Sequence, residues 1–297
     1  MKYIAYIITI AFLRLFALLP RPILYLKSDF LCFILYNIIG YRKKITTTNL
    51  RNSFPELSQK EIVSLRKKFY HHLTDLFIEN AVMLFYPRSK MEKMITFSNL
   101  ELLHEYYNRG RDLIVLSAHY NNWELSSLLA HSQDYLVIAV YKPLKNKYFD
   151  QLYIKARTRF GAAAIPMKRI GRELFDYKNN NILTLTGMIG DQRPMRRHIQ
   201  YWTNFLNQKT AVLTGTEKLA RKFNSVVIYM KVHKIQRGKY IAEFELITDN
   251  PSETAPNEIT EKYTRILEKM IMDEPAYWLW SHNRWKVNYE EWIKEHN

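Results

Sequence analysis

The distribution of apolar residues divides the chain into an apolar N-terminal part and a longer part in which short apolar runs alternate with polar segments. The first run, YIAYIITIAFLRLFALL, extends from Tyr3 to Leu19 and is interrupted by Arg14. After PRP, a second run, DFLCFILYNIIG, extends from Asp29 to Gly40. This pattern predicts two apolar helices at the start of the chain.

These two helices are only marginally long enough to cross a membrane. At about 1.5 Å per residue, the first run would reach roughly 25 Å, short of the ~30 Å hydrocarbon core of a bilayer. Cations flank or interrupt both runs: Lys2, Arg14, Arg21, Lys27, Arg42, Lys43 and Lys44. This arrangement favours helices that lie at the cytoplasmic membrane interface with their cations among lipid phosphates. Two ordinary core helices are the alternative, and a signal peptide is disfavoured because ALLPRPI offers no small-residue cleavage site.

A long amphipathic helix is predicted after the segment FPELS. Ser58 and Glu61 have the spacing of a capping box, which satisfies free backbone amides at a helix start. Five apolar residues follow at helical spacing: Ile62, Leu65, Phe69, Leu73 and Phe77. One face of this helix is therefore expected to be buried.

From Asp112 onward, β-rich runs alternate with helical stretches. The runs are DLIVLSA, YLVIAVY, AAAIPM, ILTLTGM and VVIYMKVHKI. This alternation predicts an α/β fold with a mixed, mostly parallel sheet and helices on both faces. The last run is joined to KYIAEFELIT by QRG, a hairpin signal that predicts an antiparallel edge. Since no repeat or long linker is present, we expect membrane-associated helices in residues 1–45 and one domain in residues 46–297.

Composition limits the class of protein. With 297 residues, of which 47% are hydrophobic, the chain can bury a core without disulfides. Its single cysteine, Cys32, allows neither a disulfide framework nor a cysteine-based zinc site, and fits a reducing compartment. The 44 Lys and Arg against 28 Asp and Glu give a formal charge of +16. This charge indicates a polyanionic partner, which would be a nucleic acid, an anionic bilayer, an acidic carrier protein or a phosphorylated substrate.

The stretch SAHYNNWE, Ser117 to Glu124, places a histidine and a glutamate five positions apart directly after the apolar run DLIVL. In an open α/β sheet, ligands bind beyond the carboxyl ends of the strands, and His119 lies at such an end. If a helix begins near Asn121, the Glu124 carboxylate can turn back towards the imidazole, fix its tautomer and raise its basicity. A general base requires this environment. On the evidence of the pair alone, the alternative to a catalytic base is a histidine with a structural role.

The same stretch resembles the H-x4-D/E motif of the bacterial lipid A late acyltransferases, which carry the form HFGNWE. Five further segments match this family in order: RNSFPELS, VYKP (140–143), GDQ (190–192), NFLNQKTAVLTGTEKLARKFNSVVIY (204–229) and PAYWLWSHNRWK (275–286). Two positions differ. Asn121 replaces a glycine, and asparagine tolerates a left-handed backbone. Lys142 replaces an arginine, which keeps the charge but loses the planar pair of donors.

The resemblance implies a glycerolipid acyltransferase-like fold and the transfer of an acyl chain from a carrier thioester to a hydroxyl of a membrane lipid, most directly lipid A. His119 would be the general base, with Glu124 as its orienting and charge-stabilising partner. Lys142 and nearby backbone amides would stabilise the thioester oxyanion. Asp191 and Asn122 would belong to the substrate site. A solvated lysine and a turn-capping aspartate are the alternatives for Lys142 and Asp191.

Basic residues in the segments that flank this site complete the candidate set. They are Arg157, Arg159, Arg193, Arg196 and Arg197. Lipid phosphates, or the phosphopantetheine arm and acidic surface of an acyl carrier protein, are the expected partners, with a coenzyme A thioester as the alternative donor. A solvated basic surface is the alternative for any one of them. No nucleotide-binding or metal-binding motif is present, and acyl transfer from a thioester requires no cofactor.

The sequence therefore predicts an acyltransferase at the cytoplasmic face of a bacterial inner membrane. One alternative keeps the chemistry but changes the acceptor to an aminolipid, a lysophospholipid or a glycolipid. The other is a non-enzymatic protein that binds anionic membranes. Nucleic-acid binding is disfavoured because no such motif is present and the apolar N-terminus would be unexplained. The aromatic segment YWLWSHNRW is expected either at the membrane interface or as cover over the sheet.

Overall fold

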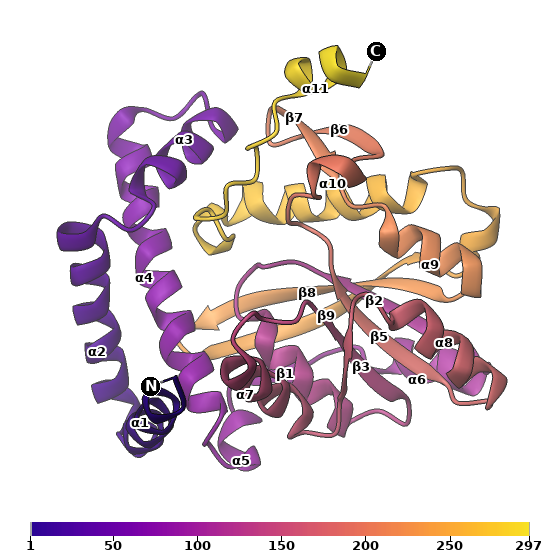
Figure 1. Ribbon diagram of the computed structural model, residues 1–297, viewed down its shortest axis with the longest axis horizontal. Coiled ribbons are helices and arrows are strands. Elements are labelled where there is room, and N and C mark those ends of the chain that lie inside the picture. Colours follow the sequence, from indigo (N-terminus) through magenta and orange to yellow (C-terminus); the bar gives the residue numbers. More distant parts are fainter. Residues whose placement is uncertain (1, 297) are drawn as a thin grey trace.

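The computed structural model of the protein describes residues 2–296 and has a central sheet flanked by helices (Figure 1). The sheet has seven strands in the order β1 (Ile95–Phe97), β9 (Lys239–Thr248), β8 (Val226–Gln236), β2 (Leu113–Ser117), β5 (Thr184–Ile189), β3 (Leu136–Tyr141) and β4 (Ala163–Pro166). All neighbouring strands are parallel except β8 and β9. The predicted α/β class with a mixed, mostly parallel sheet is confirmed.

Both faces of the sheet are covered, as continuous apolar runs predict. All five residues of β2 are buried. Leu113 and Val115 pack into one core, whereas Ile114 and Leu116 pack into another. Successive side chains of a strand point to opposite faces, so the two cores lie on the two sides of the sheet.

The predicted hairpin of β8 and β9 is present, but it does not form the edge of the sheet. Strand β1 lies beyond β9 and pairs with it in parallel. β1 has only three residues, too few for a recognisable alternation of apolar and polar positions. The separate hairpin of β6 (Tyr201–Phe205) and β7 (Gln208–Val212) was not predicted either. Its turn uses left-handed backbone at Leu206 and Asn207 rather than a glycine signal.

Helices connect the strands and cover both faces of the sheet (Figure 1). Between β1 and β8 they are α6 (Glu101–Asn108), the 3₁₀ helix η2 (Trp123–His131), α7 (Lys147–Thr158), α8 (Ile170–Asn179), the 3₁₀ helix η3 (Arg196–His198) and α9 (Gly215–Phe223). After β9 they are the 3₁₀ helix η4 (Pro251–Glu253), α10 (Glu258–Asp273), the 3₁₀ helix η5 (Pro275–Tyr277) and α11 (Tyr289–His296).

Trp278 and Trp280 follow η5 and are 2% and 0% exposed. This part of the aromatic segment is therefore core, not a membrane-interface belt.

The predicted amphipathic helix is α4 (Gln59–Met83), which lies between α3 (Lys43–Ser53) and α5 (Arg88–Met91) in the chain. Its capping box is present, with Ser58 and Glu61 each accepting a hydrogen bond from the backbone amide of the other. Four of the five predicted apolar residues are buried: Ile62, Leu65, Phe69 and Leu73. Phe77 is instead 49% exposed and lines a cavity.

The apolar N-terminal runs form α1 (Lys2–Phe16), α2 (Arg21–Phe33) and the π-helix η1 (Ile34–Ile39), and α2 lies beside α4 at one side of the molecule (Figure 1). Residues 21–39 are long and apolar enough to cross a membrane, judged by length and composition alone. Leu24, Ser28 and Cys32 form a buried stripe on α2, whereas Phe30 and Phe33 are 63% and 55% exposed. α2 therefore has one face in the protein and one apolar face in solvent. The division of the chain at residue 45 stays a prediction.

Candidate active site

The carboxyl ends of β2 and β5 bring two ionisable side chains together. Ser117, the last residue of β2, is paired in register with Ile189, the last residue of β5. His119 and Asp191 each follow two residues later, so the two side chains emerge side by side. The distance from His119 Nδ1 to Asp191 Oδ1 is 2.7 Å. This is the sheet end at which an open α/β fold binds its ligands.

Asp191 is buried in spite of its charge. Its side chain is 2% exposed, and its second oxygen, Oδ2, accepts a hydrogen bond of 2.8 Å from Trp278 Nε1. Burial alone favours the neutral acid. The charge of His119 and the hydrogen bonds from His119 and Trp278 outweigh this effect and hold the pKa of Asp191 below its ordinary value. Asp191 is thus an ionised acceptor for the imidazole.

Asp191 in turn sets the state of His119. Burial by itself lowers the pKa of His119, but the charge and hydrogen bond of Asp191, with a contribution from Glu124, leave it above the ordinary imidazole value. Because Nδ1 donates to the carboxylate, Nε2 of the neutral ring carries a free lone pair. The amide Nε2 of Gln192 lies 3.2 Å from this atom. His119 is therefore arranged as a base whose Nε2 can accept a proton.

The loop after His119 is fixed by contacts with strand β8 and with the C-terminal segment. Asn121 has a left-handed backbone, at φ +52°, as the replacement of glycine by asparagine predicts. Its side chain donates to Val232 O at 2.7 Å and its backbone amide to Tyr277 O at 3.0 Å. Tyr120 forms a bridge with Trp278, the residue that also binds Asp191. The ring of Trp123 meets the ring of His119 edge-on, with 4.8 Å between centroids.

Glu124 does not make the contact with His119 that the sequence predicts. Its carboxylate forms a two-pronged ion pair with Arg157 of α7, through Arg157 Nη2 at 2.6 Å and Nε at 2.9 Å. Trp123 Nε1 donates to the same carboxylate at 3.2 Å. The segment that holds Glu124 is a 3₁₀ helix rather than an α-helix, and it directs the side chain towards α7. Glu124 therefore influences His119 by its charge, and Asp191 is the residue that orients the ring.

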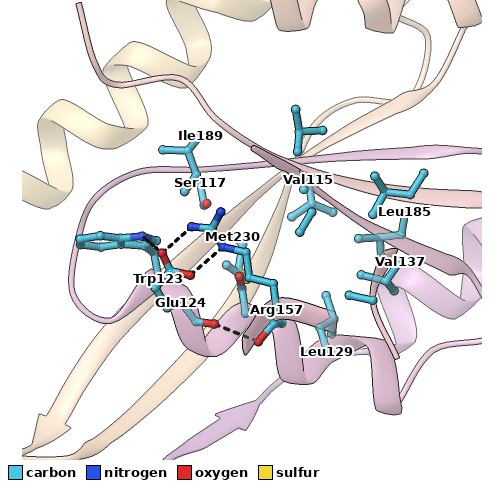
Figure 2. A pocket seen from close by; sticks show the side chains of 17 residues that line it. Val115, Ser117, Trp123, Glu124, Leu129, Val137, Arg157, Leu185, Ile189 and Met230 are labelled. Carbon is cyan, nitrogen blue, oxygen red and sulfur yellow. Dashed lines mark hydrogen bonds and ion pairs between the residues drawn. The ribbon is translucent and has the colours of Figure 1, made fainter. Parts of the chain in front are cut away.

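Two cavities meet at Trp123 and Glu124, which line both. The first is narrow, about 70 Å³, and runs between the sheet and η2. Figure 2 shows the Glu124–Arg157 pair and Trp123 together in this cavity, with aliphatic side chains such as Leu185 and Val137 extending away from them. The second is about 460 Å³ and is bordered by α4, α7 and the segment after Trp278. Gln192 and His282 lie in its wall, next to His119. A volume of this size suits a ligand-binding site.

Several residues predicted to bind substrate are instead used within the protein. Asn122 is 1% exposed, and its amide donates to the carboxylate of Glu79 at 2.7 Å. Arg159 donates to the backbone carbonyls of Met83 and Tyr86 and so holds the end of α4. The donor groups of both residues thus have partners inside the fold, and their role in substrate binding stays a prediction.

The remaining predicted residues lie outside both cavity linings. Arg196 forms an ion pair with Glu295 of α11. Arg197 is exposed, with a hydrogen bond to His198. Lys142 is exposed just beyond β3, at the same sheet end as His119. Its role at the oxyanion stays a prediction that no contact in the structure supports.

Gln192 and His282 were not predicted to belong to the site, although both lie in segments that match the family. Gln192 is the last residue of GDQ, and His282 lies in the segment WSHNRW. Burial and the charge of Arg284 lower the pKa of His282 to about 4, so this ring is neutral at pH 7. Its Nε2 accepts a hydrogen bond of 3.4 Å from the backbone amide of Arg193. In the part of the chain that the structure describes, no carboxylate forms a hydrogen bond with His282, whereas His119 is paired with Asp191, which can stabilise its cation, so His119 is the stronger candidate base. Within residues 2–296, no group of three or more His, Cys, Asp and Glu side chains is arranged to hold a metal ion.

Comparison with known proteins gives one consistent result. A sequence profile of the family described as "Bacterial lipid A biosynthesis acyltransferase" matches residues 1–287. The lipid A biosynthesis lauroyltransferase of Escherichia coli is 23% identical over 276 residues, which cover 92% of this chain and 88% of that protein. The lipid A biosynthesis palmitoleoyltransferase of the same organism is 23% identical over 278 residues, covering 93% and 89%. A lipid A biosynthesis acyltransferase of Haemophilus influenzae is 24% identical over 298 residues, covering 98% and 93%.

Replacing Asp191 by Asn tests the pair at the strand ends. A base must be neutral, so activity should fall as pH drops through the pKa of His119, which lies above the ordinary imidazole value. Removing the negative charge lowers this pKa, and the acidic limb of the pH–rate profile should move to lower pH. The plateau rate should also fall by roughly a hundredfold or more, because the amide can force the wrong tautomer. A profile with an unchanged midpoint would contradict the assignment.

Replacing Glu124 by Gln tests the ion pair with Arg157. The Arg157 side chain, 22% exposed, would lose its counter-charge, which should cost roughly 3–5 kcal/mol of stability at a buried site. Thermal unfolding measures this loss. The matched double variant Glu124→Gln/Arg157→Gln removes both charges and should be the more stable of the two. Equal stability of wild type and Glu124→Gln would show that the pair is unimportant.

Proposed function

This chain belongs to the family of bacterial lipid A biosynthesis acyltransferases and is an acyltransferase, and we propose that His119 activates the acceptor hydroxyl of lipid A for attack on an acyl-carrier thioester. The observation that carries this proposal is the His119–Asp191 pair, with Nε2 of His119 next to Gln192, which lines the 460 Å³ cavity. No serine or cysteine nucleophile is needed, because the hydroxyl of the acceptor is itself the nucleophile.

The reaction needs one proton to move twice. The acceptor hydroxyl gives its proton to His119 Nε2 as its oxygen bonds to the carbonyl carbon of the thioester. The tetrahedral oxyanion then collapses, the carbon–sulfur bond breaks, and the leaving thiolate takes the proton from the imidazolium. Asp191 stabilises the imidazolium between these two steps. An ester and a free thiol are formed, so atoms and charges balance without a cofactor.

The apolar wall of the wide cavity suits a substrate with long acyl chains. Its wall includes apolar side chains from α1, α4 and α7, among them Leu13, Leu76 and Leu152. Its wall also includes Gln192, whose side-chain amide lies 3.2 Å from His119 Nε2, where the reacting ester would form. As donor we propose an acyl carrier protein, because its acidic surface complements a chain with a formal charge of +16. Coenzyme A is the alternative donor, with its phosphates as the anionic groups.

We further propose that the protein works at the cytoplasmic face of the inner membrane, with α2 lying along the surface rather than crossing it. Arg237, in the β8–β9 turn, forms ion pairs with Asp29 of α2 and with Asp75 of α4, each at 2.6 Å. Ser28 Oγ also donates to Asp75 at 2.7 Å. A helix that crossed the bilayer would carry these charges into hydrocarbon, which is costly. The exposed apolar face of α2 is instead suited to one leaflet.

Replacing His119 by Asn tests the function. The side-chain amide of asparagine can still donate to Asp191 but cannot act as a base, so folding should be retained while transfer is lost. In a deletion strain, lipid A should lack one acyl chain by mass spectrometry. The wild-type gene should restore the chain, and the His119→Asn gene should not. Complete lipid A from the variant would refute the mechanism, and loss of a chain from another lipid class instead would refute the acceptor.

Replacing Phe30 and Phe33 together by Ser tests the membrane face. Both side chains are exposed, and each should contribute roughly 1.5–3 kcal/mol when buried in lipid. The double variant should leave the membrane fraction at least partly in a high-salt wash. Phe175→Ser is the matched control, because Phe175 lies on α8, away from the N-terminal helices, and is 54% exposed (Figure 1). Equal membrane retention of both variants would contradict the proposed surface.

A further inference from the structure

The catalytic loop is bound to a buried carboxylate that takes no part in the proposed proton transfers. Glu79 lies in α4 and is 2% exposed. Its Oε2 accepts hydrogen bonds from Asn122 Nδ2 at 2.7 Å and from Tyr240 OH at 2.8 Å. Its Oε1 accepts from Tyr25 OH at 3.0 Å. Glu79 therefore joins α4, the catalytic loop, strand β9 and the apolar helix α2.

Burial of this carboxylate costs free energy. Within residues 2–296, no lysine or arginine forms an ion pair with Glu79. Burial raises the pKa of Glu79, and the hydrogen bonds from Asn122 and Tyr240 oppose the rise without cancelling it. Apolar residues of similar volume often give a buried site equal or greater stability. Stability is thus a weak explanation for a carboxylate at this position. The groups that Glu79 binds give a stronger one.

What Glu79 holds is the end of the loop that carries the base. Asn122 is three residues after His119, and η2 begins at the next residue, Trp123. The other fixed points of this loop, at Tyr120 and Asn121, bind the C-terminal segment and strand β8. Asn122 is the point at which the loop is tied to α4. Without this bond, the backbone between His119 and Trp123 loses a hydrogen bond of 2.7 Å to the helix that borders the wide cavity.

We propose that Glu79 is a positioning residue for the acyl transfer, because its hydrogen bond to Asn122 holds the His119 loop in register with the cavity. The inference rests on the proposed role of His119 as the base. A displacement of about 1 Å in a reacting group can cost a hundredfold in rate. A loosened loop should therefore lower kcat while leaving KM for the lipid acceptor close to its wild-type value, because the cavity itself is unchanged.

Exchanging the two polar groups tests this proposal. Asn122→Asp removes the amide donor and leaves two carboxylates facing each other, so this single variant should lower kcat roughly tenfold to a hundredfold. In Glu79→Gln the side-chain carbonyl can still accept from Asn122, so this variant should stay closer to wild type. The double variant Glu79→Gln/Asn122→Asp restores one amide donor and one carboxylate acceptor. Its kcat should exceed that of the worse single variant by roughly tenfold, on the same estimate of misplacement. Initial rates with purified acyl carrier thioester and lipid A precursor give kcat and KM for all three.

Tyr240→Phe is the matched control, because it removes a hydrogen bond to the same Glu79 oxygen but leaves the bond to the loop intact. It should keep a near wild-type kcat. The proposal fails if Tyr240→Phe loses as much kcat as Asn122→Asp, if Asn122→Asp keeps wild-type kcat, or if the double variant shows no recovery. His119→Asn is measured alongside. An active His119→Asn variant would remove the proposed function, whereas an inactive one with an unaffected Asn122→Asp variant would overturn the positioning role alone.

Discussion

The hydrogen bond between His119 and Asp191 is the contact on which the rest of the site depends. Asp191 stays ionised in a buried position because His119 and Trp278 both donate to it. Trp278 is also bridged to Tyr120, the neighbour of His119. A single carboxylate therefore fixes the tautomer of the base and joins the ends of β2 and β5 to the C-terminal segment. The parallel register of β2 and β5 makes this possible, because it brings both loops to one edge at equal distance from their strands.

The second constraint is the position of the apolar N-terminal helices against the catalytic fold. α2 is tied to α4 and to the β8–β9 turn by the charges of Asp29, Asp75 and Arg237. Leu13 of α1 lines the wide cavity, which also borders Gln192 beside His119. The first N-terminal helix and the residue beside the proposed base thus line the same cavity. An enzyme that acylates a membrane lipid needs this proximity, since its acceptor has chains that remain in the bilayer.

The sequence predicted the features that depend on periodicity and strand ends. The α/β class, the capping box at Ser58 and the location of His119 at a strand end follow from such local signals. The hydrogen-bond and ion-pair partners of the side chains could not be predicted from such signals. Glu124 meets Arg157, which is 33 residues away in the chain, and a 3₁₀ helix rather than an α-helix sets its direction. Arg159 was predicted to bind phosphates, but it donates to backbone carbonyls at the end of α4. Partners of this kind leave no sequence signal.

The most direct test of this account is the tautomer of His119, measured by ¹⁵N NMR on specifically labelled protein in detergent. The hydrogen bond to Asp191 predicts that the neutral ring carries its proton on Nδ1, with Nε2 unprotonated and free to take the proton of the acceptor. The same titration should give a pKa above the ordinary imidazole value. A neutral ring protonated on Nε2, or a pKa below that value, would contradict the role of Asp191 and with it the assignment of His119 as the base.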